Sequence, residues 1–189
     1  MNIDFPGRSI IIESVREAIT GDCPKAITDC LRDTLCDLIQ RSDIELPEEF
    51  YRPGDDTYAR REIHHDPALG FSIMAMTWGP GQGTLIHDHS GMWCVEGVWS
   101  GTIEVIQYEL LEHQDDHYRF EPVTTMRTGR GSAGSLIPPH EYHTIRNPDQ
   151  KNPAVSIHIY RDEMSRCSVF LPEDKGWYTK QVRNLSCDA

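Results

Sequence analysis

The chain has 189 residues, with 18 basic and 30 acidic side chains, and its formal charge at pH 7 is −12. This acidity argues against binding to nucleic acid or to an anionic membrane surface. No apolar run approaches the roughly 18 residues that a membrane span needs, and the N-terminus lacks a basic region followed by an apolar core, so we expect a cytoplasmic protein.

Two helices are predicted in a leader over residues 1–45. Apolar residues recur at helical spacing over residues 9–20, and Gly21 provides a stop. A second helix follows, with Asp22 as its cap and Pro24 in its first turn, and apolar positions from Ile27 to Ile39 form one face. Prolines and a glycine over residues 47–54 then end the helical pattern.

The following residues, 57–183, have the pattern of short strands separated by turn residues. We place strands at residues 58–64, 71–78, 84–87, 92–99, 102–110, 118–127, 134–137, 143–146, 154–160 and 169–171. So many short strands favour a β-barrel or a rolled double sheet, because closure hides the edges that an open sheet exposes. The length suits one domain over residues 1–189, and six cysteines without a Cys-x-x-Cys pair are expected to be thiols.

A pair of histidines, His87-x-His89, follows the glycine-rich turn at residues 79–83. Side chains two apart leave the same face of a strand, so both imidazoles can point at one metal ion, although an isolated pair also arises by chance on solvated strands. A third ligand has to come from elsewhere in the fold. We choose His143, which opens a predicted strand, over His140, which lies in a proline-rich turn where side chains usually face water.

These segments resemble a known superfamily. Gly81-x5-His87-x-His89 and His143-x3-Asn147 are similar to the two metal-binding motifs of the cupins. The usual glutamate of the first motif is replaced by Cys94, and Glu96 stands two positions late. Three neutral imidazoles leave the metal its full charge for an anionic substrate, and an octahedral shell keeps three positions open for a chelating substrate and dioxygen, which favours iron.

A closer resemblance is carried by Tyr58-x-Arg60, the segment from Trp78 to His89, Cys94, His143 and Ser156-x-His158-x-Tyr160. In this order and spacing they resemble the thiol dioxygenase family, and within it the cysteine dioxygenases, over residues 58–170. The resemblance implies a mainly β cupin barrel, a double-stranded β-helix or jelly roll, behind a short N-terminal helical segment. It also implies a mononuclear Fe(II) cofactor, with a small-molecule thiol and dioxygen as the substrates of an oxidation to sulfinic acid.

The chemistry of the side chains suggests a role for each at the site. The planar fork of Arg60 suits the carboxylate of a small amino acid, with Tyr58 bracing it, while Arg61 would face the other side of the strand. The alternating residues Ser156, His158 and Tyr160 share one strand face and can form a hydrogen-bonded row toward the metal. Three buried polar groups are tolerable only if each is paired.

For two cysteines, a role at the site is implied by the resemblance alone. In the family, the cysteine at the position of Cys94 can be joined by a thioether to the strand tyrosine, here Tyr160, and Cys167 matches a thiol at the rim of the pocket. Bacterial relatives often have glycine instead, so Cys94 is not required for activity, and the simplest alternative is a small buried thiol.

Three rival functions stay open. The related 3-mercaptopropionate branch usually has glutamine at position 60 and an arginine near Arg166 to hold the carboxylate, so Arg60 favours cysteine. A zinc hydrolase would use the same histidines with an activated water, and a third possibility is a cupin that only binds a metal or thiol. We expect a monomer.

Overall fold

The computed structural model describes residues 3–188. Helix α1 (Arg8–Ala18) and helix α2 (Pro24–Gln40) form where the periodicity predicted them. The predicted cap of α2 was wrong: Pro24 takes the first helical position, so the cap residue is Cys23 rather than Asp22. Within residues 3–188, no helix is both long and apolar enough to cross a membrane.

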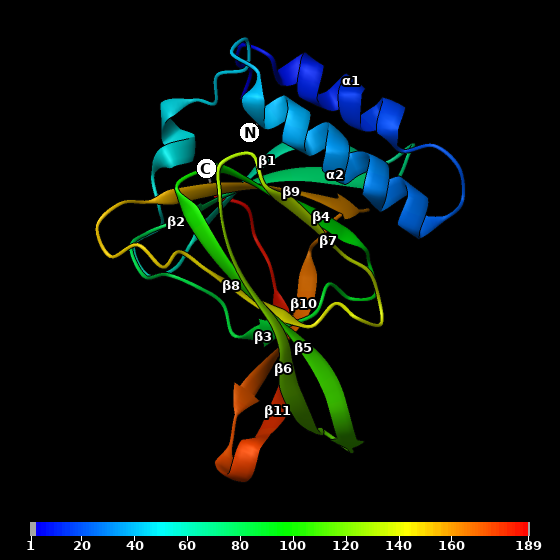
Figure 1. The fold of residues 1–189 in the computed structure, drawn as a ribbon, viewed down its shortest axis with the longest axis vertical. Coiled ribbons are helices and arrows are strands. Elements are labelled where there is room, and N and C mark those ends of the chain that lie inside the picture. The colour runs from blue at the N-terminus through cyan, green and yellow to red at the C-terminus, as the bar shows by residue number, and fades with distance from the viewer. Residues whose placement is uncertain (1–2, 189) are drawn as a thin grey trace.

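The strands build two sheets. The first sheet has the order β1-β2-β9-β4-β7, and β10-β11-β6-β5-β8-β3 close into a barrel. Figure 1 shows both helices on one side of the five-stranded sheet and the barrel strands on the other. The mainly β cupin barrel with a short N-terminal helical segment is therefore confirmed. The bounds are β1 (Ala59–Asp66), β2 (Phe71–Trp78), β3 (Ile86–His87), β4 (Cys94–Ser100), β5 (Thr102–Gln114), β6 (His117–Gly129), β7 (Ala133–Leu136), β8 (His143–Arg146), β9 (Ala154–Arg161), β10 (Arg166–Pro172) and β11 (Trp177–Asn184), with short 3-10 turns at Glu48–Tyr51 and Asp174–Gly176.

The strand predictions differ from the structure in four main respects. Strand β10 begins at Arg166 rather than at residue 169. Strands β5 and β6 continue past their predicted ends and pair as a long hairpin. Strand β3 has only two residues, so His89 lies just beyond it. Strand β11 was not predicted, because most of its residues are exposed and it lacks the apolar alternation of a half-buried strand; it is held by pairing with β10 and β6.

Two cores lie on opposite faces of the five-stranded sheet. On β4, Val95 and Trp99 pack in the core beneath the helices, whereas Cys94 and Val98 belong to the core inside the barrel. Alternation along the strand separates the two sets. The interior core is the one that surrounds the functional side chains described below.

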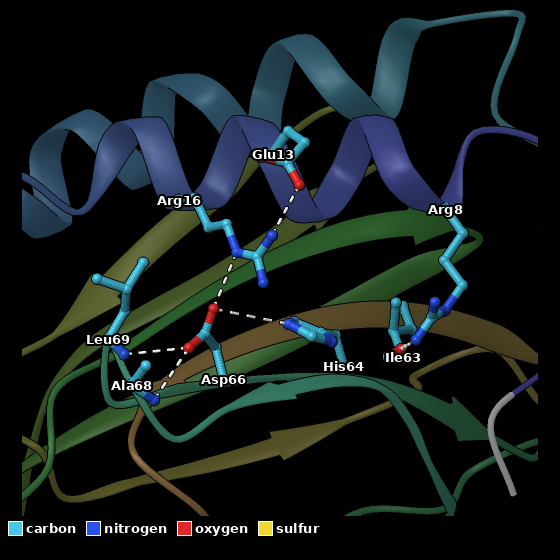
Figure 2. Close-up of polar contacts among 8 residues, drawn as sticks. All are labelled: Arg8, Glu13, Arg16, Ile63, His64, Asp66, Ala68 and Leu69. Carbon is cyan, nitrogen blue, oxygen red and sulfur yellow. Dashed lines mark hydrogen bonds and ion pairs between the residues drawn. The ribbon is translucent and has the colours of Figure 1, made fainter.

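Polar contacts fix α1 on strand β1 (Figure 2). Arg16 Nε donates to Asp66 Oδ2 at 2.9 Å, and Arg8 Nη2 donates to the carbonyl of Ile63 at 2.8 Å. Asp66 Oδ1 accepts the backbone N–H groups of Ala68 and Leu69, at 3.1 and 3.0 Å. These backbone bonds, aided by Arg16, hold the pKa of Asp66 below its ordinary value. The strand that carries Arg60 is thereby tied to the helical layer.

Candidate metal centre

Three histidines converge inside the barrel. His87 on β3 lies directly opposite His143 on β8, and His89 follows β3 by two residues. The ring centroids of His87 and His143 are 4.2 Å apart, and those of His89 and His143 are 5.0 Å apart. One ligand atom from each of the three lies within 4.8 Å of the others. His140, the alternative third ligand, is exposed.

The chemistry of the three rings fits a bound metal. A carbonyl oxygen can only accept, so His87 Nδ1–H donates to Leu85 O at 3.1 Å and His143 Nδ1–H donates to Glu141 O at 2.9 Å. Both rings keep the Nε2 lone pair free, and Nδ1 of His89 is buried without a hydrogen-bond partner. Burial lowers the pKa of His87, and lowers the pKa values of His89 and His143 further, so the rings are neutral, the form of imidazole that binds a metal.

Glu141 supports the centre from the loop before β8, a role that the sequence did not reveal. Its Oε2 accepts the backbone N–H of His89 at 2.9 Å, and its own carbonyl orients His143. Partners of this kind hold metal ligands in place. Only its position two residues before His143, a predicted ligand, could have indicated this role in the sequence.

A small cavity of about 20 Å³ adjoins the histidines. It shares six lining residues with a wider pocket of about 360 Å³, which also includes the C-terminal residues 183–186 and Asp188. The space beside the metal centre therefore suits a small substrate. The shared residues are Tyr58, Arg60, Thr84, His87, Cys167 and Leu185.

Arg60 places a cation in this cavity, with only 5% of the residue exposed. Its Nη2 donates to Met164 O at 2.9 Å and its Nη1 to Ser186 O at 3.3 Å, while Nε has no hydrogen-bond partner. Two neutral carbonyls orient the guanidinium without neutralising it. Tyr58 is stacked on Trp78 at 4.4 Å between ring centroids.

The neighbouring arginines lie elsewhere. Arg61 Nη1 donates to Thr77 Oγ1 at 3.4 Å, and Thr77 in turn donates to the carbonyl of Phe50, outside the barrel cavity. Arg166 is exposed at the start of β10 and lines neither of the two connected pockets. Of these three arginines, Arg60 is thus the one whose side chain lines the cavity.

The predicted polar row on β9 lies beside the histidines. Ser156 Oγ is 2.7 Å from His158 Nε2, and Tyr160 Oη is 3.4 Å from His158 Nδ1. The ring of Tyr160 is 5.4 Å from that of His89. Burial lowers the pKa of His158 to about 3 and raises the pKa of Tyr160 well above its ordinary value, so both side chains are neutral near pH 7.

The two cysteines also lie near the cavity. Cys94 on β4 is the register partner of Tyr160 on β9, and both are buried. Cys167 on β10 lines both pockets, and burial raises the pKa of its thiol to about 11. Each is therefore a protonated thiol at neutral pH unless it reacts.

Glu96 is a buried acid that the sequence interpretation set aside as a displaced cupin glutamate. It is the register partner of His158, and its Oε2 lies 3.4 Å from His158 Nδ1. Burial raises its pKa to about 7. Together with Cys94 and His158 it forms a second group of ligand-type atoms within 4.8 Å. Glu96 is two residues from Cys94 on a predicted strand, and this spacing indicates that both side chains leave the same face of the strand.

A closed, mainly β barrel with three imidazoles gathered in its interior has the architecture of a cupin, and these three side chains could hold a metal ion. Residues 41–172 match the family model described as cysteine dioxygenase type I. The chain belongs to the cysteine dioxygenase type I family, in agreement with the resemblance found in its motifs.

Individual relatives are distant. The chain is 24% identical to cysteine dioxygenase type 1 of Rattus norvegicus over 100 residues, and 26% identical to that of Danio rerio over 110 residues. Each match covers 53% of this chain and 49% of the relative, so the chain spans about half the length of the curated relatives it matches. A double-stranded beta-helix protein of Klebsiella pneumoniae aligns with a TM-score of 0.47 and 17% identity, covering 75% of this chain and 100% of that one.

Proposed function

We propose that this protein is a mononuclear iron thiol dioxygenase whose substrate is L-cysteine. The reaction adds both atoms of dioxygen to the sulfur of the thiol and gives cysteine sulfinic acid, so it needs no further reductant. The observation that carries the proposal is the buried guanidinium of Arg60, in the same cavity as three neutral imidazoles. Within residues 3–188 its side-chain hydrogen bonds go to two backbone carbonyls.

The metal would be Fe(II), held by His87, His89 and His143. When bound, it supplies the redox-active centre at which a thiol and dioxygen react. The protein fixes the three ligands through backbone contacts, because the carbonyls of Leu85 and Glu141 orient two of the rings. It also keeps the rings unprotonated, since a charged imidazole would be costly at this depth.

Arg60 would bind the substrate carboxylate. A buried cation is stabilised by a charge-assisted partner, and a planar guanidinium can give a carboxylate oxygen well-aligned donors. With the carboxylate held at Arg60, the thiol and amine of a small amino acid lie toward the histidines across the same cavity. The C-terminal segment supports this position, because Asp188 Oδ2 accepts the backbone N–H of Arg60 at 2.7 Å.

Tyr160 would act as a neutral donor beside the reacting atoms. Its raised pKa keeps the phenol proton in place, and its ring packs next to His89. We further propose a thioether between Cys94 and Tyr160, because the two face each other across the pairing of β4 and β9. The new carbon–sulfur bond would replace the S–H bond of Cys94 and one ring C–H bond of Tyr160, and dioxygen, already a substrate, would take up the two electrons and two protons. Such a link would stop the phenol from rotating and remove a thiol that competes for the metal.

Oxygen uptake with a panel of thiols tests the proposal. Metal-free protein is loaded anaerobically with Fe(II) or Zn²⁺ and then mixed with L-cysteine, cysteamine, homocysteine or 3-mercaptopropionate in aerated buffer. We expect uptake only with iron, fastest with L-cysteine, at one dioxygen per cysteine sulfinic acid formed. Faster turnover of 3-mercaptopropionate would transfer the assignment to the related branch, and no uptake with any thiol would refute a thiol dioxygenase.

A further inference from the structure

His158 has polar neighbours at both ring nitrogens. Its Nε2 lies 2.7 Å from Ser156 Oγ, which also accepts the indole N–H of Trp78 at 2.8 Å. Because an indole nitrogen only donates, the hydroxyl of Ser156 is left with its own proton to give, and Nε2 of His158 is the acceptor beside it. The proton of the neutral His158 ring then lies on Nδ1.

The Nδ1 proton has two possible acceptors at equal distance. Tyr160 Oη and Glu96 Oε2 each lie 3.4 Å from His158 Nδ1. The contact with Tyr160 has the geometry of a long hydrogen bond, whereas Glu96 Oε2 is buried without a hydrogen-bond partner. Both distances exceed the roughly 2.7–3.2 Å of a well-formed hydrogen bond, so a small side-chain rotation decides which acceptor takes the proton. A buried carboxylate oxygen without a donor is costly, which favours Glu96. A carboxylate attracts an N–H group more strongly than a neutral phenol does.

We propose that Glu96 is a positioning residue that holds the Nδ1 proton of His158 and thereby fixes the His158 tautomer that accepts from Ser156 and leaves Tyr160 unengaged. Its consequence for turnover rests on the proposed function. With the imidazole proton held by Glu96, Tyr160 Oη keeps both its proton and its lone pairs for the substrate. Glu96 acts through His158 and touches no reacting atom.

The position of Glu96 argues for a specific role. It lines a second cavity, of about 70 Å³, which shares only Ile145 with the cavity at the histidines. Apart from Glu96, the lining residues of this second cavity are apolar residues, glycines, serines and a threonine. The ionisable groups near Glu96 are His158 and Tyr160 on β9 and Cys94 on its own strand. A buried carboxylate is costly in such surroundings, so a purely structural position would be better filled by an apolar side chain.

Histidine NMR tests the contact without any bound metal. Metal-free protein carrying ¹⁵N-labelled imidazoles is titrated from pH 5 to 9 as wild type, Glu96→Gln and Glu96→Leu, and the His158 signals are identified by their loss in His158→Gln. In the wild type we expect an Nδ1–H signal shifted downfield, with a midpoint near pH 7 as Glu96 ionises. Both features should vanish in the two Glu96 variants. The control Glu104→Gln removes a carboxylate that pairs with Arg146 at the barrel surface and should leave both features intact.

Turnover provides the second readout. In the iron-loaded enzyme, Glu96→Gln should lower kcat for L-cysteine by about 10- to 100-fold, as loss of an orienting partner typically does, with KM changed by less than about twofold. If the wild type oxidises no thiol, the proposed function fails while the NMR titration still decides the role of Glu96.

Two results would overturn the inference. One is a His158 signal whose position and pH midpoint are the same in wild type and Glu96→Gln. The other is a wild type that binds two metal ions per chain, one of them lost in both Glu96→Gln and Cys94→Ser, because Glu96 would then be a ligand in a second metal site.

Discussion

Replacing Arg60 with alanine removes the guanidinium from the cavity and leaves the three histidines in place. If Arg60 binds the carboxylate of cysteine, that carboxylate then enters a buried site without its cation. Losing one partner of such a charge pair costs about 2–5 kcal/mol. At about 1.4 kcal/mol per factor of ten, kcat/KM for L-cysteine should fall by some thirtyfold to a few thousandfold.

The assay compares L-cysteine with cysteamine, which has the same thiol and amine but no carboxylate. Cysteamine should be a poor substrate of the wild type and should lose little more in Arg60→Ala. Arg61→Ala is the matched control, since it removes an equal charge from the next residue on the opposite strand face, where the side chain contacts Thr77. The control should keep the preference for cysteine.

Two outcomes would refute this reasoning. An equal loss with both thiols would mean that Arg60 supports the fold or the metal rather than the carboxylate. Preference of the wild type for 3-mercaptopropionate, abolished by Arg166→Ala, would assign carboxylate binding to the exposed arginine on β10.

Four further predictions concern the metal, the cross-link and stability. His143→Ala should lose bound iron and oxygen uptake together in metal analysis, and full iron at full rate would exclude it as a ligand. After many turnovers a denaturing gel should show two bands for the wild type and one for Cys94→Ser; a single unlinked wild-type band would contradict the link to Tyr160. The pKa of Glu96 is raised from 4.5 to about 7 in the folded protein, so ionisation of Glu96 lowers the free energy of unfolding. This destabilisation is absent below pH 4.5, grows between pH 4.5 and pH 7, and is constant above pH 7. At about 1.4 kcal/mol per pKa unit, the stability of Glu96→Gln relative to wild type should rise by about 3 kcal/mol between those limits in urea titrations, and a pH-independent difference would be evidence against this burial. The pKa of Asp66 is instead depressed, so the ionised carboxylate stabilises the fold at pH values above 3.8, the ordinary pKa, and this stabilisation is lost as the pH falls below it. Asp66→Asn should therefore melt at a lower temperature than the wild type at pH 7 and at nearly the same temperature at pH 3. Equal melting temperatures at pH 7 would contradict the role of Asp66.

The elements with clear periodicity could be predicted from the sequence. Strands β2 and β8 agree with the predicted residues, and both helices lie within a few residues of their predicted places. Strand β11 could not be predicted, because its stability comes from pairing with β10 and β6 rather than from a buried face of its own. Local pattern contains no information about such partners.

The placement of candidate site residues could be predicted where spacing determines which face of a strand a side chain takes. Arg60, His158 and Tyr160 each lie on a strand, and the structure brings them to one cavity with the three histidines. Glu96 could not be predicted as a site residue from the cupin motif, because it stands two positions beyond the motif's glutamate. Its partner His158 is 62 positions away in the sequence, and only the register of β4 and β9 brings the two together.

That register depends on the outer face of β4, which contacts no functional residue. A Cβ atom on Gly97 would lie 2.8 Å from Leu35 Cδ2 and 2.9 Å from Ile39 Cδ1, so α2 packs directly against the backbone of the strand. Because side chains alternate, the close approach of the helix at Gly97 keeps Cys94 and Glu96 on the inner face. A slip of one residue would exchange the two faces and place both beneath the helix. Residues 3–45 contribute no side chain to the cavity at the histidines, yet the packing of α2 helps to determine which residues of β4 meet Tyr160 and His158.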